Sequence, residues 1–269
     1  MTPTPPPVIL VFAGNDPSGG AGIQADIQTL VSMGCHAAPV ITAITVQDTV
    51  GVKQFSVTAP ELVIAQARAV LNDMPVAAFK IGMLGSVANV RAIAELVRGY
   101  ENTPIIIDPI LASGHGDNLS QEPLEEALCA MLLPYATLIT PNSLEARRLA
   151  PHADTLEACA QELLSYGCQH VLITGTHEVT PEVTNYLYGN KRLLETFNWE
   201  RLPGQYHGSG CTLAAACAAT LAHGLDPVNA VREAQSYTWH TLKHGFHLGM
   251  GQMIPDRLYW SHDTPDDTH

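Results

Sequence analysis

The sequence predicts an α/β fold in which a mainly parallel central sheet is covered by helices on both faces and carries a small hairpin or flap at its edge. Short apolar runs without charged residues, such as residues 8–13, have the pattern of strands buried on both faces. Segments that begin with a capping side chain lie between these runs and predict helices. The alternation of the two patterns indicates strands joined by helical crossovers, which is how a parallel sheet is connected.

The expected elements follow one another along most of the chain. Further strands are expected at residues 38–45, 51–57, 76–81, 105–108, 136–140 and 171–174. Residues 185–188 and 192–196 flank Gly189-Asn190, which is typical of a β-hairpin at a sheet edge. Helices are expected after the first glycine-rich loop as far as Met33, from a capping box at Thr58 to Leu71, near Ser86, Ser120, Asn142 and Thr155, and twice after residue 207, the last from Asp226 to Gly245.

Size and composition limit the classes of protein that this chain can represent. With 269 residues, 46% of them hydrophobic, the chain can bury a substantial core, and we expect residues 8–262 to form a single domain. Residues 1–7 are expected to be a disordered leader and residues 263–269 a polar tail. The formal net charge of −13 argues against nucleic acid or an anionic membrane surface as the main partner.

Two observations concern the cellular setting. No apolar run approaches the length of a membrane span, and the first residues lack the basic region of a signal peptide. The six cysteines include no C-x-x-C pair, and a domain of this size needs no disulfides to fold. We therefore expect reduced cysteines and a cytoplasmic protein.

The segment Gly208-Ser209-Gly210-Cys211 leads directly into an alanine-rich stretch that predicts a buried helix. A helix N-terminus presents backbone N–H groups without internal partners and a partial positive charge, and glycines let the backbone approach a ligand closely. The segment therefore predicts a cradle for a phosphate group, with Cys211 at its mouth, where a thiolate would be stabilised. The alternative is a loop that enters a buried helix, with Cys211 as a small core residue.

The first glycine-rich loop permits more than one interpretation. Gly20-Ala21-Gly22-Ile23-Gln24-Ala25 matches the dinucleotide fingerprint G-x-G-x-x-A, and Asp48 follows the next expected strand. Pro17-Ser18, however, lies where that motif requires a tight turn, and no lysine follows Gly19-Gly20 as a Walker A loop requires. The loop still allows backbone to lie against a small ligand. Asp26 then lies one turn into the helix, either accepting hydrogen bonds from a ring nitrogen or amino group or simply facing solvent.

Polar side chains follow several of the expected strands. Because the carboxyl ends of parallel strands meet at one edge of a sheet, these side chains are expected to gather there, close to the phosphate cradle. Asp108, at the end of such a strand, suits Mg²⁺ held mainly through water. Asn142 and Glu145 offer either a second oxygen cluster or an Asn-x-x-Glu capping box.

Three stretches together resemble the hydroxymethylpyrimidine/phosphomethylpyrimidine kinases of thiamine biosynthesis, within the ribokinase-like superfamily. They are Ala13-Gly14-Asn15-Asp16-Pro17-Ser18-Gly19-Gly20-Ala21-Gly22-Ile23-Gln24-Ala25-Asp26, Lys80-Ile81-Gly82-Met83-Leu84 and His207-Gly208-Ser209-Gly210-Cys211-Thr212-Leu213. The likeness extends over essentially the whole chain from Val8. It implies a three-layer ribokinase-like fold and a homodimer.

The resemblance also implies an activity and a set of site residues. The activity is ATP- and Mg²⁺-dependent phosphorylation of the hydroxymethyl group of 4-amino-5-hydroxymethyl-2-methylpyrimidine, followed by phosphorylation of the monophosphate. The implied pyrimidine pocket comprises Gly14, Ala21, Asp26, Thr45, Gln47, Met83 and Ile110. Backbone groups of Gly208, Ser209, Gly210 and Cys211 would hold the phosphoryl group, with Cys211 as a base or hydrogen-bond partner of the hydroxyl. Asn142, Glu145, Thr174 and Gly175 would face ATP, and Asp108 and Glu145 would face Mg²⁺.

The chain departs from the family pattern at three places where many relatives carry lysine. They read Thr174-Gly175-Thr176-His177, Ser113-Gly114-His115-Gly116-Asp117 and Gly249-Met250-Gly251. The absence of these charges bears on the efficiency of the second phosphorylation. The alternatives are a pyridoxal or pyridoxamine kinase, a nicotinamide-dependent dehydrogenase that uses the Gly20–Ala25 match, and a non-catalytic sensor of a vitamin precursor.

Overall fold

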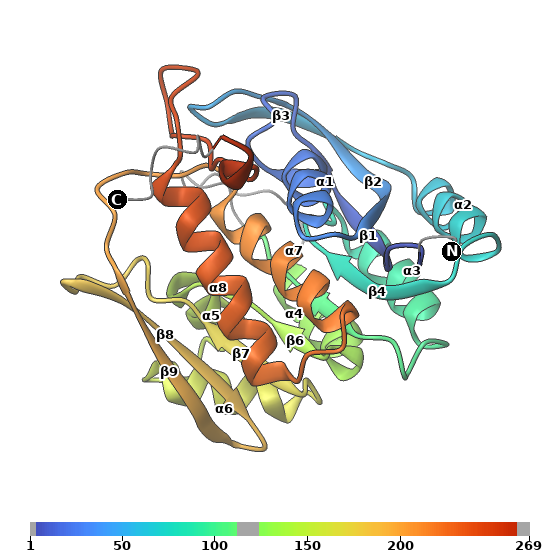
Figure 1. The fold of residues 1–269 in the computed structure, drawn as a ribbon. Helices are drawn as coiled ribbons and strands as arrows, with labels where there is room; N and C mark the ends of the chain where they lie inside the picture. Colours follow the sequence, from blue (N-terminus) through green and yellow to red (C-terminus); the bar gives the residue numbers. More distant parts are fainter. Residues whose placement is uncertain (1–3, 112–123, 263–269) are drawn as a thin grey trace.

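A nine-stranded sheet runs through the part of the chain that the computed structural model describes, residues 4–111 and 124–262 (Figure 1). The strand order is β3-β2-β1-β4-β5-β6-β7-β8-β9. The expected helix near Ser120, the segment 113–117, the first residues of the leader and the polar tail lie outside the described residues. The domain limits at residues 8 and 262 therefore stay a prediction.

Six neighbouring strands of the sheet are parallel, and the three remaining strands are antiparallel at its two ends. The parallel strands are β1 (Val8–Asn15), β2 (His36–Gln47), β4 (Val76–Ile81), β5 (Ile105–Ile107), β6 (Leu138–Ile139) and β7 (His170–Ile173). The antiparallel strands are β3 (Val52–Val57), β8 (Glu182–Gly189) and β9 (Arg192–Glu200). The predicted mainly parallel sheet with an edge hairpin is confirmed.

The helices form a layer on each face of the sheet. One layer contains α1 (Gly22–Ser32), α7 (Ser209–Ala222) and α8 (Pro227–Lys243), and the other contains α2 (Pro60–Leu71), α3 (Val87–Val97), α4 (Leu124–Ala127), α5 (Ser143–Leu149) and α6 (Leu156–Ser165). Along β1, Leu10 and Phe12 join one apolar core while Ile9, Val11 and Ala13 join the other. Successive side chains of a strand point to opposite faces, so a strand between two helix layers must be apolar throughout.

Helix α7 is buried between the sheet and α8. All residues from 211 to 221 are buried, and most of them are alanine or another small residue. Small side chains let the helix approach both neighbours closely, and its contacts with α1, α8 and β4 fix its direction. The N-terminus of α7 is therefore held at the edge of the sheet where the parallel strands end (Figure 1).

Side-chain caps begin three of the helices as the sequence predicts. The hydroxyls of Ser86 and Thr155 and the amide oxygen of Asn142 accept backbone N–H groups at the starts of α3, α6 and α5. The expected capping box at Thr58 is wrong, because Ala59 is the N-cap of α2 and Pro60 is its first residue. The N–H of Thr58 is instead bonded to the carbonyl of Thr42 on β2.

The hairpin turn also differs from its expected position. Gly189 is the last residue of β8 and pairs with Arg192, so the turn consists of Asn190 and Lys191, which have φ angles of 50° and 56°. Two residues with positive φ give the twist that a two-residue hairpin needs, and asparagine adopts this conformation readily.

No helix in the described part of the chain has the length and apolarity to cross a membrane.

We expect Thr155→Ala to lower the free energy of unfolding by about 1 kcal/mol, because the Thr155 hydroxyl accepts the N–H of Ala158 at 3.1 Å. In a domain of this size that loss corresponds to a fall in melting temperature of roughly 2–4 °C. Thr155→Ser, which keeps the hydroxyl, serves as the control in the same thermal scan. A melting temperature unchanged in Thr155→Ala would contradict the role of this cap.

Candidate active site

A cavity of about 800 Å³ lies at the carboxyl ends of the parallel strands, beside the N-terminus of α7. It brings together nearly all of the predicted site residues. Those that line it are Gly14, Ala21, Thr45, Gln47, Met83, Asp108, Ile110, Asn142, Glu145, Thr174, Gly208, Ser209, Gly210 and Cys211. Asp26 and Gly175 are not among the residues that line it. The residues predicted from the sequence therefore gather at one cavity, with Asp26 and Gly175 outside its lining.

Hydrogen bonds to the carboxylate of Asp16 hold the first glycine loop in a compact turn. This carboxylate, 1% exposed, accepts hydrogen bonds from the N–H groups of Ser18 and Ala21, both at 2.8 Å, and lies 2.9 Å from Nε2 of His207. Burial by itself would raise the pKa of Asp16, but the hydrogen bonds from His207, Ser18 and Ala21 outweigh it and lower the pKa. Because His207 immediately precedes the second glycine segment, this pair joins the two loops.

Gly208 is the point at which the two glycine loops touch. It is the N-cap of α7 with a φ of 76°, and a Cβ built on it would lie 2.1 Å from the carbonyl oxygen of Gly20 and 2.8 Å from Cα of Ala21. Glycine is therefore required here both for the left-handed conformation and for the close approach. The free N–H groups of the first turn of α7 thus open onto the cavity that the first loop lines.

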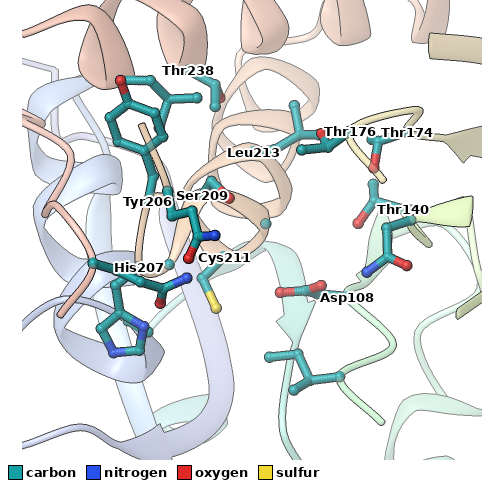
Figure 2. A pocket seen from close by; sticks show the side chains of 18 of the residues that line it. Asp108, Thr140, Thr174, Thr176, Tyr206, His207, Ser209, Cys211, Leu213 and Thr238 are labelled. Atoms are coloured by element: carbon teal, nitrogen blue, oxygen red, sulfur yellow. The ribbon is translucent and has the colours of Figure 1, made fainter. Parts of the chain in front are cut away.

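Cys211 and Asp108 point into this cavity from different elements (Figure 2). A Cβ on the neighbouring Gly210 would lie 3.8 Å from Oδ1 of Asp108, so the first turn of α7 packs directly against the end of β5. Burial raises the pKa of the Cys211 thiol, the charge of Asp108 raises it further, and Lys80 opposes both without cancelling them. The raised pKa favours a neutral thiol in the ligand-free protein and does not support the expected thiolate.

Behind the cavity wall lies a buried charge cluster that the sequence did not suggest. Nζ of Lys80 lies 3.0 Å and 3.1 Å from the two carboxylate oxygens of Asp26 and 3.7 Å from Oδ2 of Asp108. Lys80 and Asp26 are fully buried. Burial raises the pKa of Asp26 to about 6 although Lys80 opposes the shift, and the pKa of Lys80 is raised by the two carboxylates despite its burial. Asp26, predicted to contact the substrate, is paired with Lys80 and does not line the cavity.

Asn142 and Glu145 form the capping box that was the alternative interpretation. Oδ1 of Asn142 accepts the N–H of Leu144 at 3.0 Å and that of Glu145 at 2.9 Å, while Oε2 of Glu145 accepts the N–H of Asn142 at 2.9 Å. Both side chains also line the cavity. Burial, followed by the charge of Asp108, raises the pKa of Glu145 to about 8. Two carboxyl groups that oppose each other's ionisation are a place where a divalent cation would be stabilising.

Thr174 and Gly175 were both predicted to face ATP, but only one of them lies at the cavity. Thr174 lines the cavity, whereas Gly175 packs against β8, where a Cβ would lie 2.2 Å from the carbonyl oxygen of Thr184. Its N–H donates to Oδ1 of Asn185 at 2.9 Å. Gly175 therefore positions β8 rather than facing the cavity.

The end of the cavity between α7, α8 and β9 was not predicted. Apolar and aromatic side chains line it, among them Leu213, Trp199 and Trp239. The two indole rings are stacked with centroids 6.4 Å apart. No motif marks these residues, because they come from three elements distant in the sequence; the only signal was the apolar side of each element.

We expect Glu145→Gln to stabilise the protein at alkaline pH. The unfolded Glu145 ionises near 4.5 and the folded one only near 8, so the folded state holds an extra proton between these values and the free energy of unfolding falls as the pH rises. Glutamine keeps an acceptor for Asn142 and avoids this loss, with an expected gain on the order of 2 kcal/mol at pH 9. Urea unfolding without nucleotide or metal at pH 5.5 and 9 measures it.

The exposed Glu61 on the first turn of α2 provides the matched control for that measurement. Glu61→Gln is expected to change the free energy of unfolding equally little at both pH values. If Glu145→Gln has the same stability as the unsubstituted protein at pH 9, ionisation of the half-buried Glu145 carboxyl does not carry the stated cost.

Comparison with known proteins identifies the family. The phosphomethylpyrimidine kinase family model matches residues 16–256. The hydroxymethylpyrimidine/phosphomethylpyrimidine kinase of Mycobacterium tuberculosis is 40% identical over 252 residues, which are 91% of this chain and 92% of that protein.

Two solved structures are similar along most of their length. The phosphomethylpyrimidine kinase of Clostridium difficile has a TM-score of 0.75 and 33% identity and covers 86% of this chain and 97% of its own. The pyridoxal kinase of Staphylococcus aureus, in complex with AMP-PCP and pyridoxal, has a TM-score of 0.85 and 26% identity and covers 96% of this chain and 95% of its own. The ribokinase-like fold is thereby confirmed, and this chain belongs to the phosphomethylpyrimidine kinase family.

Proposed function

We propose that this chain transfers the γ-phosphoryl group of ATP to the hydroxymethyl group of 4-amino-5-hydroxymethyl-2-methylpyrimidine and then phosphorylates the monophosphate, in thiamine biosynthesis. Its membership of the family and the names of its relatives support this activity. The single observation that carries the proposal is the contact between the two glycine loops at Gly208 and Gly20. That contact brings a surface for a flat ring beside a helix N-terminus that binds phosphate.

The pyrimidine ring lies, in this proposal, against the first glycine loop. Gly14 and Ala21 give it a flat backbone surface, and Met83 and Ile110 give it apolar contacts. Thr45 and Gln47 are the polar side chains within reach of the ring nitrogens and amino group. Asp26 does not contact the ring in this proposal, because its carboxylate is buried behind the cavity and paired with Lys80.

The phosphoryl group is held at the N-terminus of α7. Backbone N–H groups from Gly208 to Cys211 are aimed at the charge that develops on the equatorial oxygens during transfer. The neutral thiol of Cys211 is placed to hydrogen-bond the hydroxymethyl oxygen and orient it. Asn142 and Thr174 face the remaining phosphates of ATP, and the apolar end of the cavity near Leu213 and Trp239 accepts the adenine ring.

Asp108 and Glu145 are the residues that would hold Mg²⁺. The fit is supported by Oδ2 of Asp108, which is buried and has no hydrogen-bond partner among the described residues. Its nearest cation, Nζ of Lys80, lies 3.7 Å away, so a metal ion would give this oxygen the direct contact that it lacks. Two carboxylates completed by water and substrate phosphates are an ordinary set of Mg²⁺ ligands. When bound, the ion would neutralise negative charge on the phosphates.

We also infer a cytoplasmic homodimer. The six cysteines are all free and buried, as expected in a reducing compartment. The outer part of the sheet beside β3 exposes Ile44 and Val46 on β2 and Val50 after it, by 57%, 54% and 51%. Neighbouring apolar side chains at a sheet edge favour burial against a second copy.

Cys211→Ala is expected to lower kcat about tenfold, because it removes one hydrogen bond to the alcohol and not a base. Loss of a true general base would cost about 10²- to 10⁴-fold. Steady-state kinetics with saturating ATP distinguish the two sizes of effect. Cys211→Ser, which keeps a donor and acceptor, is the matched control and should retain more activity than Cys211→Ala. A loss of kcat greater than a hundredfold in Cys211→Ala would indicate that Cys211 acts as a general base.

The activity itself is tested by separating the products formed from the pyrimidine alcohol, ATP and Mg²⁺. The expected products are the monophosphate and then the diphosphate, with the second step the slower one because the phosphate-site lysines are absent. Pyridoxal is the second substrate in the same assay, since the structural likeness to a pyridoxal kinase favours that candidate next. A kcat/KM higher for pyridoxal than for the pyrimidine alcohol would favour a pyridoxal kinase over the proposed pyrimidine kinase.

A further inference from the structure

Arg257, in the segment that follows α8, is a buried cation to which no part of the proposed mechanism has yet given a role. Its side chain is 1% exposed. Within residues 4–111 and 124–262 it forms no ion pair with a carboxylate, and its three nitrogens instead donate to uncharged oxygens. The charges of Asp26 and Asp16 act on it only from a longer distance than an ion pair. Burying a guanidinium without a directly paired carboxylate is costly, so a role beyond stability is expected for it.

The three acceptors of Arg257 belong to three different elements. Nη2 donates to the carbonyl of Gly20 at 2.6 Å, Nε to the hydroxyl of Thr212 at 2.9 Å and Nη1 to the side chain of Gln28 at 3.2 Å. Gly20 lies in the first glycine loop, Thr212 in the first turn of α7 and Gln28 in α1. One planar group therefore fixes the first loop to the helix that forms the phosphate cradle.

The guanidinium lies directly behind the contact between the two loops. A Cβ on Gly208 would lie 3.0 Å from Nη2 of Arg257, and Thr212 donates its hydroxyl to the carbonyl of Gly208 at 2.8 Å while it accepts from Nε. Arg257 is itself anchored to α8, because the Tyr237 hydroxyl donates to its carbonyl at 2.8 Å. Its position is thus fixed by the packed helix layer and not by the loops that it holds.

We propose that Arg257 is a positioning residue for phosphoryl transfer. It holds the ring-facing loop and the phosphate cradle at a fixed separation, and its charge adds to the positive potential at the N-terminus of α7. The inference rests on the proposed function, in which the alcohol is bound by one loop and the phosphoryl group by the other. Transfer needs reacting atoms about 3–3.5 Å apart, and a displacement of about 1 Å can cost roughly a hundredfold in rate.

Arg257→Met removes the charge and all three donors while keeping a long side chain. We expect kcat to fall about 30- to 100-fold and the KM values for alcohol and ATP to change less than about fivefold, because each loop still binds its own ligand. Arg257→Lys keeps the charge but cannot reach three acceptors at once, so it should restore part of the lost kcat. Arg232→Met makes the same substitution at an exposed arginine of α8 that does not line the cavity, and it should keep kcat within about twofold.

Each outcome decides the proposal. A folded Arg257→Met enzyme with kcat within threefold of the unsubstituted enzyme overturns it, and so does an equal loss in Arg232→Met. If Arg257→Met does not fold, Arg257→Lys decides, because an unchanged kcat in that variant contradicts a three-point clamp.

A second measurement separates this proposal from the proposed function. Hydrogen exchange of the ligand-free protein is compared between Arg257→Lys and the unsubstituted chain. The clamp predicts faster exchange in residues 18–22 and 208–213 and no change in α2 or α3. If the unsubstituted protein does not phosphorylate the pyrimidine alcohol, the function fails while this readout still tests the clamp; unchanged exchange in both loops overturns the clamp alone.

Discussion

Lys80→Met is expected to lower the free energy of unfolding by about 3–5 kcal/mol, because it leaves two buried carboxylates without their cation. Lys80 lies within 3.1 Å of both oxygens of Asp26 and 3.7 Å from Asp108. Methionine fills nearly the same volume, so the loss reports the missing charge rather than a cavity. Urea unfolding at pH 7 measures it.

The size of this loss should depend on pH in a direction set by Asp26. Even with Lys80 present the pKa of Asp26 is raised to about 6, and removal of Lys80, which opposes the shift, raises it further. Below that pH the buried carboxyl takes up a proton and the missing cation matters less. The deficit of Lys80→Met should therefore be smaller at pH 5 than at pH 7.

Two further variants make this prediction decisive. Lys80→Met combined with Asp26→Asn removes one of the two unpaired charges and should recover part of the lost stability. Lys53→Met removes the exposed partner of Asp48 and should cost less than about 1 kcal/mol. If Lys80→Met lowers the free energy of unfolding no more than Lys53→Met does, the stabilising role of Lys80 in the buried cluster is contradicted.

The part of the site that could be predicted from sequence follows from topology. Gly14, Met83, Asp108 and Asn142 each come just after or at the end of a parallel strand, and such ends share one edge of a sheet. Cap residues such as Asn142 could be predicted for a similar reason, because a cap contacts only its own helix. These inferences needed only the order of the elements along the chain.

The features of the site that could not be predicted from the sequence depend on burial and on side-chain direction. Ile23, Asp26 and Leu30 share the buried face of α1, but a carboxylate on such a face is expected only with a buried partner. The signal for that partner is Lys80, a lysine within an apolar strand. The ionisation of Cys211 could not be predicted for the same reason: its place at a helix N-terminus follows from the sequence, but the burial that raises the pKa of its thiol does not. Arg257 follows no motif, and its three acceptors lie 45, 229 and 237 residues away from it in the sequence.

Gly208→Ala is expected to lower kcat/KM about a thousandfold, since it disturbs both the position of the alcohol and the N–H groups that stabilise the transferring phosphoryl group. A methyl group at this position meets the carbonyl oxygen of Gly20 at 2.1 Å and Cα of Ala21 at 2.8 Å, so the two loops must separate. The alanine also has to adopt a φ of 76°, which costs about 1–2 kcal/mol of stability by itself. Steady-state kinetics and thermal unfolding of the same preparation measure the two effects.

The other end of α7 supplies the control that separates strain from contact. Gly224 has a φ of 86°, yet a Cβ built on it meets nothing within 4 Å. Gly224→Ala therefore carries the same conformational cost without pushing any segment aside, and it should lose a similar 1–2 kcal/mol of stability, roughly, while kcat/KM stays within about twofold. If Gly208→Ala loses no more activity than Gly224→Ala, contact between the two glycine loops is not what brings alcohol and phosphate together.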